Sequence, residues 1–336
     1  MTSQGSTPAA SSRPPGRPVR EEPPGGNAPS PPAPPPPRTP ARAASQDGAA
    51  VRAALEEEAG LFPSGPENLS PRDGGRIFAR PFLGFAAGDD PAWFLVREAV
   101  GEGSWIPEEA FARGGAGPGA RPAVPAPDLT VLAAVLPQTP ETVARQGEAT
   151  AMPADPWVAS KYFHDRAVNG LMLRLAGRLA ALGIEAVVPE LAEGYGTFPH
   201  ERWRITSSWS HRHAAWAAGL GTFGLCDGLI TRAGKAHRLG SLVFRAAVPA
   251  SPRPYAGFRD WCLHYAPVPG GCGRCIGRCP AGALSPAGHD KALCRDFLYG
   301  TRGWAQGRFP DLPGADACGL CQAAVPCATR APAGRP

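Results

Sequence analysis

Short apolar runs alternate with a helical segment in the middle of the chain. Residues 129–136 form a mainly apolar run that ends at Pro137, which is typical of a buried strand. Apolar side chains then recur with helical spacing over residues 155–182, a segment that opens with Asp-Pro and is followed by Gly183, so one long helix is predicted. Residues 184–189 are a second short apolar run and a second predicted strand. The strand–helix–strand order predicts an α/β fold with a sheet covered by helices.

The hydrophobic pattern is weaker on either side of this region. Residues 61–100 are expected to contribute a helix and loops, and the glycine- and proline-rich residues 114–127 a long surface connection. Residues 211–218 are rich in alanine and helix-like, whereas residues 228–231 are typical of a strand.

A glycine loop lies between these last two segments. Gly219, Gly221 and Gly224 match the G-x-G-x-x-G pattern of dinucleotide-binding loops. That pattern indicates a dinucleotide site where it follows a strand and opens a helix. Here a helical segment precedes it and a strand follows, so we expect the glycines to mark a helix C-terminus rather than a nicotinamide or flavin site.

Composition separates the N-terminal part of the chain from the rest. The chain has 336 residues, of which 43% are hydrophobic, and it can hold a sizeable core in about two domains. Residues 1–48 are proline-rich and offer few apolar side chains, so burial cannot offset the entropy lost on ordering them. We expect a disordered tail, either a plain solvated extension or a docking segment for a protein that binds polyproline.

The net charge and the absence of targeting signals bear on which partners and which compartment we expect for this protein. A net charge of +5 over this length is too mild to indicate nucleic-acid binding by itself. The sequence has no signal-peptide pattern and no run of about 20 apolar residues, so we expect a cytoplasmic protein without membrane contact. A reducing compartment would keep its thiols free to bind metal.

The cysteines carry the clearest chemical signal. Eight of the nine lie between Cys262 and Cys327 and include the run Cys272-x2-Cys275-x3-Cys279-Pro. A short cysteine run closed by Cys-Pro is how ferredoxin-type domains bind cubane iron–sulfur clusters. In the two-cluster form of this pattern, the cysteine before the proline binds the other cluster. Cys279 is that residue here.

Two four-iron clusters need eight thiolates, the number that remains when the remote Cys226 is set aside. Two positions of the pattern are shifted, because Pro269 and Val325 stand where cysteines are expected and Cys262 and Cys327 lie nearby. We therefore predict two ligand sets. Set A comprises Cys279, Cys294, Cys318 and Cys321, and set B comprises Cys262, Cys272, Cys275 and Cys327.

Other interpretations of these cysteines stay open. Paired Cys-x2-Cys units also form zinc ribbons, but zinc would leave half of the eight cysteines without a role. Disulfides require an oxidising compartment, which nothing in the sequence indicates. Cys226 is either a reactive thiol or a small buried apolar residue.

Three residues beside the glycine loop are candidates for proton transfer. His211 and His213 could supply protons, since imidazole titrates near neutral pH, or they could simply decorate a helix. Asp227 could act as a general acid if burial raised its pKa, or it could form a turn.

The chain resembles a known family in the order of its motifs. Ala-Gly219-Leu-Gly221-x-x-Gly224, the Cys-x2-Cys-x3-Cys-Pro run, Asp290-x3-Cys294 and a final Cys-x2-Cys-Gln follow one another as in epoxyqueuosine reductases and reductive dehalogenases. The resemblance covers roughly residues 155–330. It implies a nitroreductase-like α/β domain at residues 49–255, with cobalamin and the three glycines as cofactor-binding residues, and a two-cluster ferredoxin-like domain at residues 256–331.

The resemblance also implies a function and partners. We expect an iron–sulfur oxidoreductase that takes electrons from a reduced ferredoxin or flavodoxin type of donor and passes them through two [4Fe-4S] clusters to the α/β domain. The alternative is a non-catalytic electron carrier that docks a redox partner. Leu225 replaces the family's lysine, and residues 205–211 contain no aspartate where the reductases have their proton donor. These departures, with the absence of the C-terminal helical repeats, make tRNA a doubtful partner.

Overall fold

The computed structural model describes residues 46–114, 124–201, 204–266 and 271–332. The predicted disordered tail lies outside the described residues up to position 45, and so does most of the predicted connection, at residues 115–123. Helix α1 (Gln46–Leu61) begins within the last residues assigned to the tail. The helical spacing of Val51, Leu55 and Ala59, all buried, accounts for this start.

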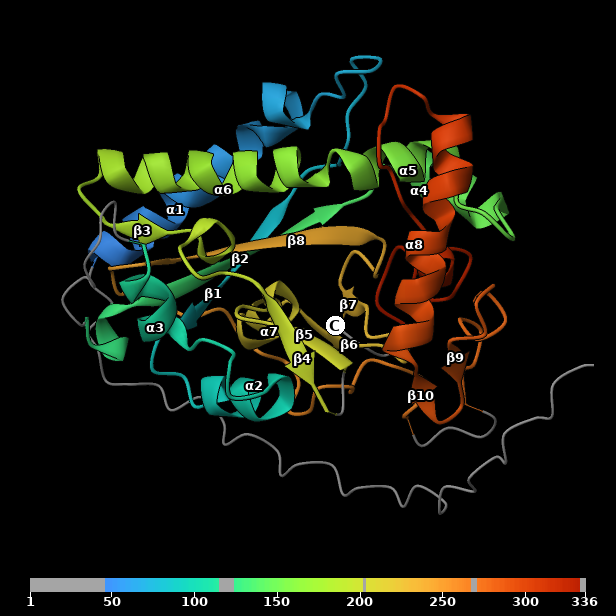
Figure 1. Ribbon diagram of the computed structural model, residues 1–336. Helices are drawn as coiled ribbons and strands as arrows, with labels where there is room; N and C mark the ends of the chain where they lie inside the picture. Colours follow the sequence, from blue (N-terminus) through green and yellow to red (C-terminus); the bar gives the residue numbers. More distant parts are fainter. Residues whose placement is uncertain (1–45, 115–123, 202–203, 267–270, 333–336) are drawn as a thin grey trace, which may run out of the picture. The chain divides into compact units, whose positions relative to one another are not determined.

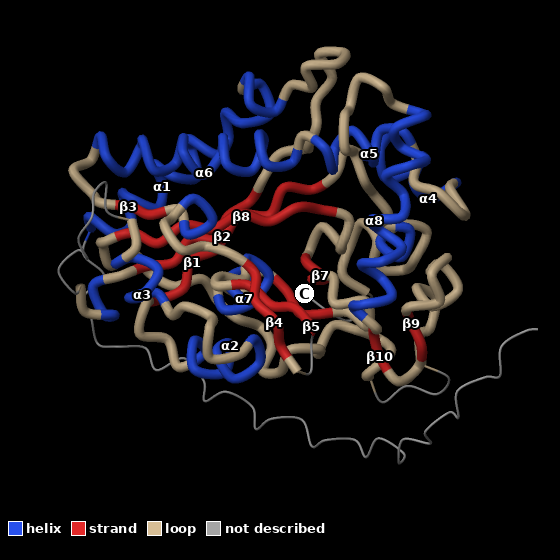
Figure 2. The backbone as a smooth tube through the Cα atoms, viewed as in Figure 1, coloured by secondary structure: helices blue, strands red, loops and turns tan. Residues whose placement is uncertain are grey.

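A four-stranded sheet forms the centre of the fold (Figures 1 and 2). Its order is β1 (Phe82–Ala87), β2 (Thr130–Pro137), β8 (His237–Phe244) and β3 (Ala186–Val187), and each neighbouring pair is antiparallel. The predicted strand at 129–136 is β2. The second predicted strand is shorter than expected, with only two residues of 184–189 paired in β3.

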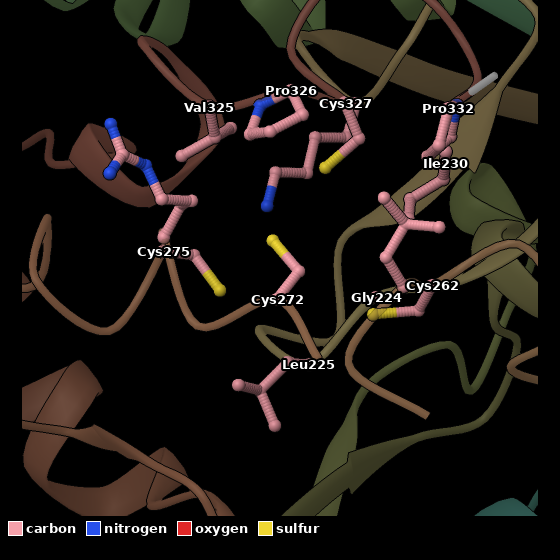
Figure 3. A pocket seen from close by; sticks show the side chains of 13 residues that line it. Gly224, Leu225, Ile230, Cys262, Cys272, Cys275, Val325, Pro326, Cys327 and Pro332 are labelled. Carbon is pink, nitrogen blue, oxygen red and sulfur yellow. The ribbon is translucent and has the colours of Figure 1, made fainter. Parts of the chain in front are cut away.

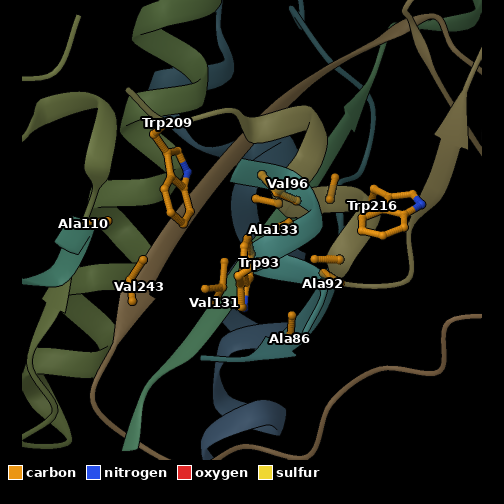
Figure 4. Close-up of a cluster of buried hydrophobic side chains, with 14 of the residues drawn as sticks. Ala86, Ala92, Trp93, Val96, Ala110, Val131, Ala133, Trp209, Trp216 and Val243 are labelled. Carbon is orange, nitrogen blue, oxygen red and sulfur yellow. The ribbon is translucent and has the colours of Figure 1, made fainter. Parts of the chain in front are cut away.

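Alternating side chains of β2 supply two apolar layers. Val131 and Val135 belong to one buried cluster, and Leu132 and Leu136 belong to the other. α1 and α6 (His164–Ala181) cover the second face, and α2 (Ala92–Val100), α3 (Pro107–Ala112) and α7 (His211–Ala217) cover the first (Figure 1). Figure 4 shows the first layer, in which Trp93 and Trp209 stack with ring centroids 5.8 Å apart. The mixed α/β character predicted from the sequence is thus present.

The single long helix predicted over 155–182 is two helices. α5 (Asp155–Tyr162) ends at Phe163, whose φ of −92° and ψ of 7° depart from helical values, and α6 starts directly after it. The apolar spacing does not reveal this break, because the ring of Phe163 packs against the core on the α6 side. Gly183 follows the end of α6 with φ +72°, as expected of a helix-terminating glycine.

The order of elements around the glycine loop matches the prediction. α7 spans the alanine-rich segment, and Gly219 follows it with φ +79° and donates its N–H to the carbonyl of Trp216. The loop then enters β6 (Gly221–Phe223), which pairs with β7 (Leu229–Thr231). The G-x-G-x-x-G match therefore ends a helix and does not open one.

The remaining regular elements are short apart from one C-terminal helix. They are α4 (Pro140–Glu148), the hairpin β4 (Thr197–His200) with β5 (Arg204–Ser207), the hairpin β9 (Leu284–Ser285) with β10 (Gly288–His289), and α8 (Lys291–Arg308). Single 3₁₀ turns occur at Phe62–Ser64, Pro66–Asn68, Ala126–Asp128, Pro189–Leu191 and Leu320–Gln322. None of the described helices combines the length and the apolar character needed to cross a bilayer.

Candidate metal centre

One pocket brings together the four cysteines of set B (Figure 3). About 370 Å³ of space not filled by atoms lies in this pocket, part of it open to solvent. Its walls come from the glycine loop, from β7, from the first cysteine run and from the segment before the C-terminus: Gly224, Leu225, Ile230, Lys235, Cys262, Leu263, Cys272, Arg274, Cys275, Val325, Pro326, Cys327 and Pro332. Residues far apart in the sequence, including Cys262 and Cys327, therefore line the same pocket.

Tight turns and apolar packing hold these cysteines. Cys262 donates its N–H to the carbonyl of Arg259 at 3.0 Å, and the carbonyl of Cys327 accepts the N–H of Lys235 at 2.9 Å. Cys262 and Cys275 are buried in an apolar cluster with Trp261, among other residues. This burial raises the pKa of the Cys275 thiol to about 12, against the lowering effect of Lys235. At neutral pH this burial favours the protonated form of the thiol.

The cysteines of set A lie close enough to influence one another's pKa values. Burial raises the pKa of the Cys318 thiol, and the charges of Cys294 and Cys279 raise it further. Cys294 lies in the first turn of α8, and the carbonyl of Cys318 accepts a hydrogen bond from Gln146 Nε2 at 2.8 Å. The N–H of Ala283 donates to Cys279 Sγ at 3.3 Å, a type of contact that tunes cluster potentials.

Among the described residues, no three or more His, Cys, Asp or Glu side chains lie close enough to hold one metal ion. A zinc site needs four ligands on a single ion, whereas the thiolates around a four-iron cluster bind different irons.

Cys226 lies at the site although it belongs to neither set. It is buried, and Lys235 Nζ lies 3.3 Å from its Sγ. Its hydrogen bond with Cys321 and the charge of Lys235 hold the pKa of this thiol well below its usual range, although burial opposes them. Cys226 therefore makes polar contacts at its buried position and does not act only as a small apolar residue.

Sequence reasoning missed Lys235. Its side chain is 2% exposed and lines the pocket of set B. A lysine almost never lies fully buried without a charged partner, so this position is unusual. The only signal in the sequence is that Lys235 interrupts an otherwise uncharged run between Arg232 and His237.

The three glycines of the loop differ in their surroundings. A Cβ atom on Gly219 would lie 2.2 Å from the carbonyl oxygen of Pro252, and one on Gly221 would lie 2.1 Å from that of Ile230. Close packing of the protein's own backbone therefore explains these two glycines. Gly224 instead lines the pocket of set B, so the loop forms one wall of the cysteine site.

Asp227 is surrounded by cationic side chains. Arg259 and His289 lie 3.2 and 3.0 Å from its two carboxylate oxygens, and Lys291 lies 3.9 Å from it. Burial would raise the pKa of Asp227, but the hydrogen bond from His289 and the charges of Lys291 and Arg259 outweigh it and lower that pKa. The condition for a general acid, a raised pKa, is therefore not met. The same contact contributes to raising the pKa of His289 to about 9, although burial opposes it.

The two candidate histidines have different partners. Burial, with smaller effects from Arg212 and Lys291, lowers the pKa of His213 to about 3, so its ring is neutral near pH 7. Its ring packs 4.6 Å from that of Phe223. Its Nδ1 also lies 2.8 Å from Ser210 Oγ, so the neutral ring has both a packing partner and a hydrogen-bonding partner.

His211 belongs to a hydrogen-bonded chain. Trp209 Nε1 donates to Ser241 Oγ at 2.8 Å, which leaves the hydroxyl hydrogen of Ser241 to be donated to His211 Nδ1 at 2.7 Å. His211 Nε2 then donates to Glu190 Oε2 at 3.2 Å. This hydrogen bond lowers the pKa of Glu190, although burial opposes it. Neither histidine lines the pocket of set B, and Glu190 was not predicted from the sequence.

Comparisons with known proteins point to one group of folds. No protein-family model matches the chain, and neither does any curated protein. A catabolic reductive dehalogenase structure aligns with a TM-score of 0.45 and 13% identity over 83% of this chain and 36% of that one. An epoxyqueuosine reductase structure aligns with a TM-score of 0.40 and 17% identity over 83% of this chain and 66% of that one.

A second epoxyqueuosine reductase, from Bacillus subtilis, aligns with a TM-score of 0.35 and 17% identity over 85% of this chain and 67% of that one. This chain therefore spans about a third of the dehalogenase and about two thirds of the reductases. At low sequence identity, its structure is similar to those of epoxyqueuosine reductases and reductive dehalogenases.

Proposed function

We propose that this chain is an iron–sulfur oxidoreductase in which sets A and B each hold a [4Fe-4S] cluster. The observation that carries the proposal is the pocket lined by all four cysteines of set B. Two of them, Cys262 and Cys327, were assigned only because they lie near positions where the ferredoxin pattern lacks a ligand. Chance would not be expected to bring both of them to the same space as Cys272 and Cys275.

The residues at the site fit such clusters chemically. Thiolates are the ligands that these clusters use, and the walls of the pocket are mainly apolar, which limits access of water and influences the potential. When bound, each cluster would accept and release one electron. The protein's part is to hold the eight thiolates and to exclude solvent.

The neighbours of each set support one direction of electron flow. Set B adjoins the glycine loop through Gly224 and Leu225, so its cluster would lie beside that loop, whereas set A contacts α4 through Gln146. Set A includes Cys294 on α8, a helix with exposed Leu293 and Tyr299. We therefore expect a ferredoxin or flavodoxin type of donor to reduce the cluster at set A first. The cluster at set B would then deliver the electron to the α/β part of the chain.

His211 is the proton donor that we favour for the reduction. Protons must accompany electrons in most reductions, and its ring contacts Glu190 while keeping 15% of its side chain exposed. Glu190 orients the ring through this contact. Asp227 instead has a structural role, because its salt bridges join the glycine loop to Arg259 and His289.

Cobalamin, which the resemblance implies, does not enter this scheme. Gly219 and Gly221 face the protein's own backbone and form no open cradle for a cofactor, so they do not fit the role predicted for them. A solved epoxyqueuosine reductase structure contains a tRNA stem loop, and tRNA remains a proposal for this chain.

Anaerobic purification and reconstitution with iron and sulfide test the proposal. We expect about eight irons per chain, broad visible absorption and a paramagnetic signal after reduction with dithionite. A colourless protein that binds zinc in place of iron would contradict it. Corrinoid bands in the same spectrum would favour the enzyme with cobalamin, and clusters without any substrate reduction would favour the non-catalytic carrier.

A further inference from the structure

Lys235 lies where the two cysteine sets approach each other. Its Nζ is 3.3 Å from Cys226 Sγ, and Cys226 in turn forms a hydrogen bond with Cys321 of set A. On its other side, Lys235 lines the pocket of set B. Its backbone N–H donates to the carbonyls of Cys327 and Ala328 at 2.9 and 3.1 Å, which fixes the residue beside set B.

The ammonium group of Lys235 lies among sulfur atoms. Within the described ranges, no carboxylate forms an ion pair with it, and its side chain is 2% exposed. A charged group at such a buried position needs opposite charge nearby, and the thiolates of bound clusters are the anions that this geometry offers.

We propose that Lys235 is a buried fixed charge that raises the reduction potential of the clusters at sets A and B. This inference rests on the proposed function. Adding an electron to a cluster adds negative charge, and a nearby cation stabilises the reduced form most strongly where the dielectric constant is low. Lys235 does not bind iron in this proposal. It acts through the thiolates that do.

Arg274 provides a matched comparison. It lines the same pocket and carries the same charge, but its side chain is exposed. Water and salt screen an exposed charge, so its effect on the potential is expected to be small. Both residues line one pocket. If the two substitutions shift the midpoint potential by different amounts, the difference therefore reflects how deeply each charge is buried.

The experiment is a potentiometric titration of the reconstituted protein, followed by electron paramagnetic resonance. Lys235→Met keeps the length of the side chain and removes the charge. At a fixed potential we expect its ratio of reduced to oxidised cluster to fall about tenfold, which corresponds to about 59 mV for a one-electron couple. Arg274→Met should shift the midpoint much less. Unchanged midpoints in Lys235→Met at wild-type iron content would overturn the inference.

Loss of iron from the variant is also informative. If Lys235→Met and Lys235→Gln both fail to hold iron while Lys235→Arg retains clusters with a near wild-type midpoint, the charge is required and the inference stands. Loss of iron from all three variants would mean that the position acts through packing, and would overturn it. Absence of any cluster in the wild-type protein would instead refute the proposed function itself.

Discussion

Cys275 and Cys226 lie in the same apolar cluster, yet we expect them to differ in their relation to iron. Cys275 is assigned to set B, so Cys275→Ser should lower bound iron by about half, because a cluster that lacks one thiolate is lost. Cys279→Ser should do the same for set A. Cys226→Ser should leave the iron content unchanged, and it serves as the matched control. The test is to measure the iron and sulfide bound per chain in each of the three variants after anaerobic reconstitution.

The control decides the ligand assignment. If Cys226→Ser also halves the iron, then Cys226 is a ligand and one of the eight assigned cysteines is not. The contact between Cys226 and Cys321 makes this outcome a serious test, because the two thiols already share a hydrogen bond.

His237 supplies a prediction about acid stability. Its Nε2 donates to the carbonyl of Leu229 at 2.8 Å, and burial lowers its pKa to about 4. Between pH 6.5 and about 4, the unfolded chain therefore binds a proton that the folded chain excludes. Stability from this neutral histidine is full above pH 6.5 and is lost as the pH falls towards 4, by up to about 1.4 kcal/mol per pH unit.

The variant His237→Gln tests this linkage. Glutamine keeps a donor for the carbonyl of Leu229 and cannot titrate. Urea unfolding at a series of pH values should show a shallower loss of stability below pH 6.5 in the variant than in the wild type. Cluster loss in acid affects both proteins, so the difference between their slopes is the quantity to compare. Parallel curves would contradict the assignment of a buried neutral ring.

Elements with strong local patterns could be predicted from the sequence. The apolar run of β2 and the glycine after α7 are local signals, and both led to the observed elements. β8, the strand between β2 and β3, was not predicted, because its sequence mixes His237 and Arg238 with apolar residues. Both of its partners lie earlier in the chain, and the paired residues are more than 50 positions apart, so sheet order depends on contacts that a local window does not contain.

Two helix-terminating glycines permit a matched test of packing. Gly219 and Gly183 both have positive φ, +79° and +72°. A Cβ atom would meet the carbonyl oxygen of Pro252 at Gly219, whereas nothing lies within 4 Å of the corresponding position at Gly183. Gly183→Ala should therefore cost about 1–2 kcal/mol, the strain of the backbone alone. Gly219→Ala should cost more than about 3 kcal/mol.

Denaturant unfolding of both variants measures these costs. Comparable values at the two positions would show that the turn after α7 can move away from Pro252. In that case the glycine loop would be less rigid than its close packing suggests, and Gly224 would be free to shift relative to the pocket of set B.

At the scale of the whole molecule, the candidate site is assembled from segments that the sequence does not connect. The spacing of the cysteines led to the eight candidate ligands, because ligand spacing within a cluster motif is a local property. Lys235 and Glu190 carry no motif. Their importance depends on where β7, β8 and α7 place Cys226 and His211, and such placement is a product of topology.

Iron should stabilise the C-terminal segment selectively. Beyond Cys262 the described residues contain only two short hairpin strands each of two residues, α8 and a 3₁₀ turn, so backbone hydrogen bonding alone offers little resistance to opening. The apolar cluster there includes the cysteines themselves. Contacts with the α/β part include the ion pair of Lys161 with Asp316 and an apolar cluster that joins Trp157 to Phe309, and these contacts hold α8 and the segment after it. Cluster binding would supply much of the remaining folding free energy around the cysteines.

Hydrogen exchange before and after anaerobic chelation of iron measures this dependence. We expect amides from residues 271–327 to lose protection when iron is removed, while those of β2, buried at the centre of the sheet, keep theirs. Loss of protection in both regions would mean that the sheet also depends on the clusters, so that the molecule unfolds as one cooperative unit. Unchanged exchange in the cysteine segment would mean that the thiols hold their positions without iron. The apolar packing around Cys262 and Cys275 would then preform the pocket, and metal binding would contribute little to folding.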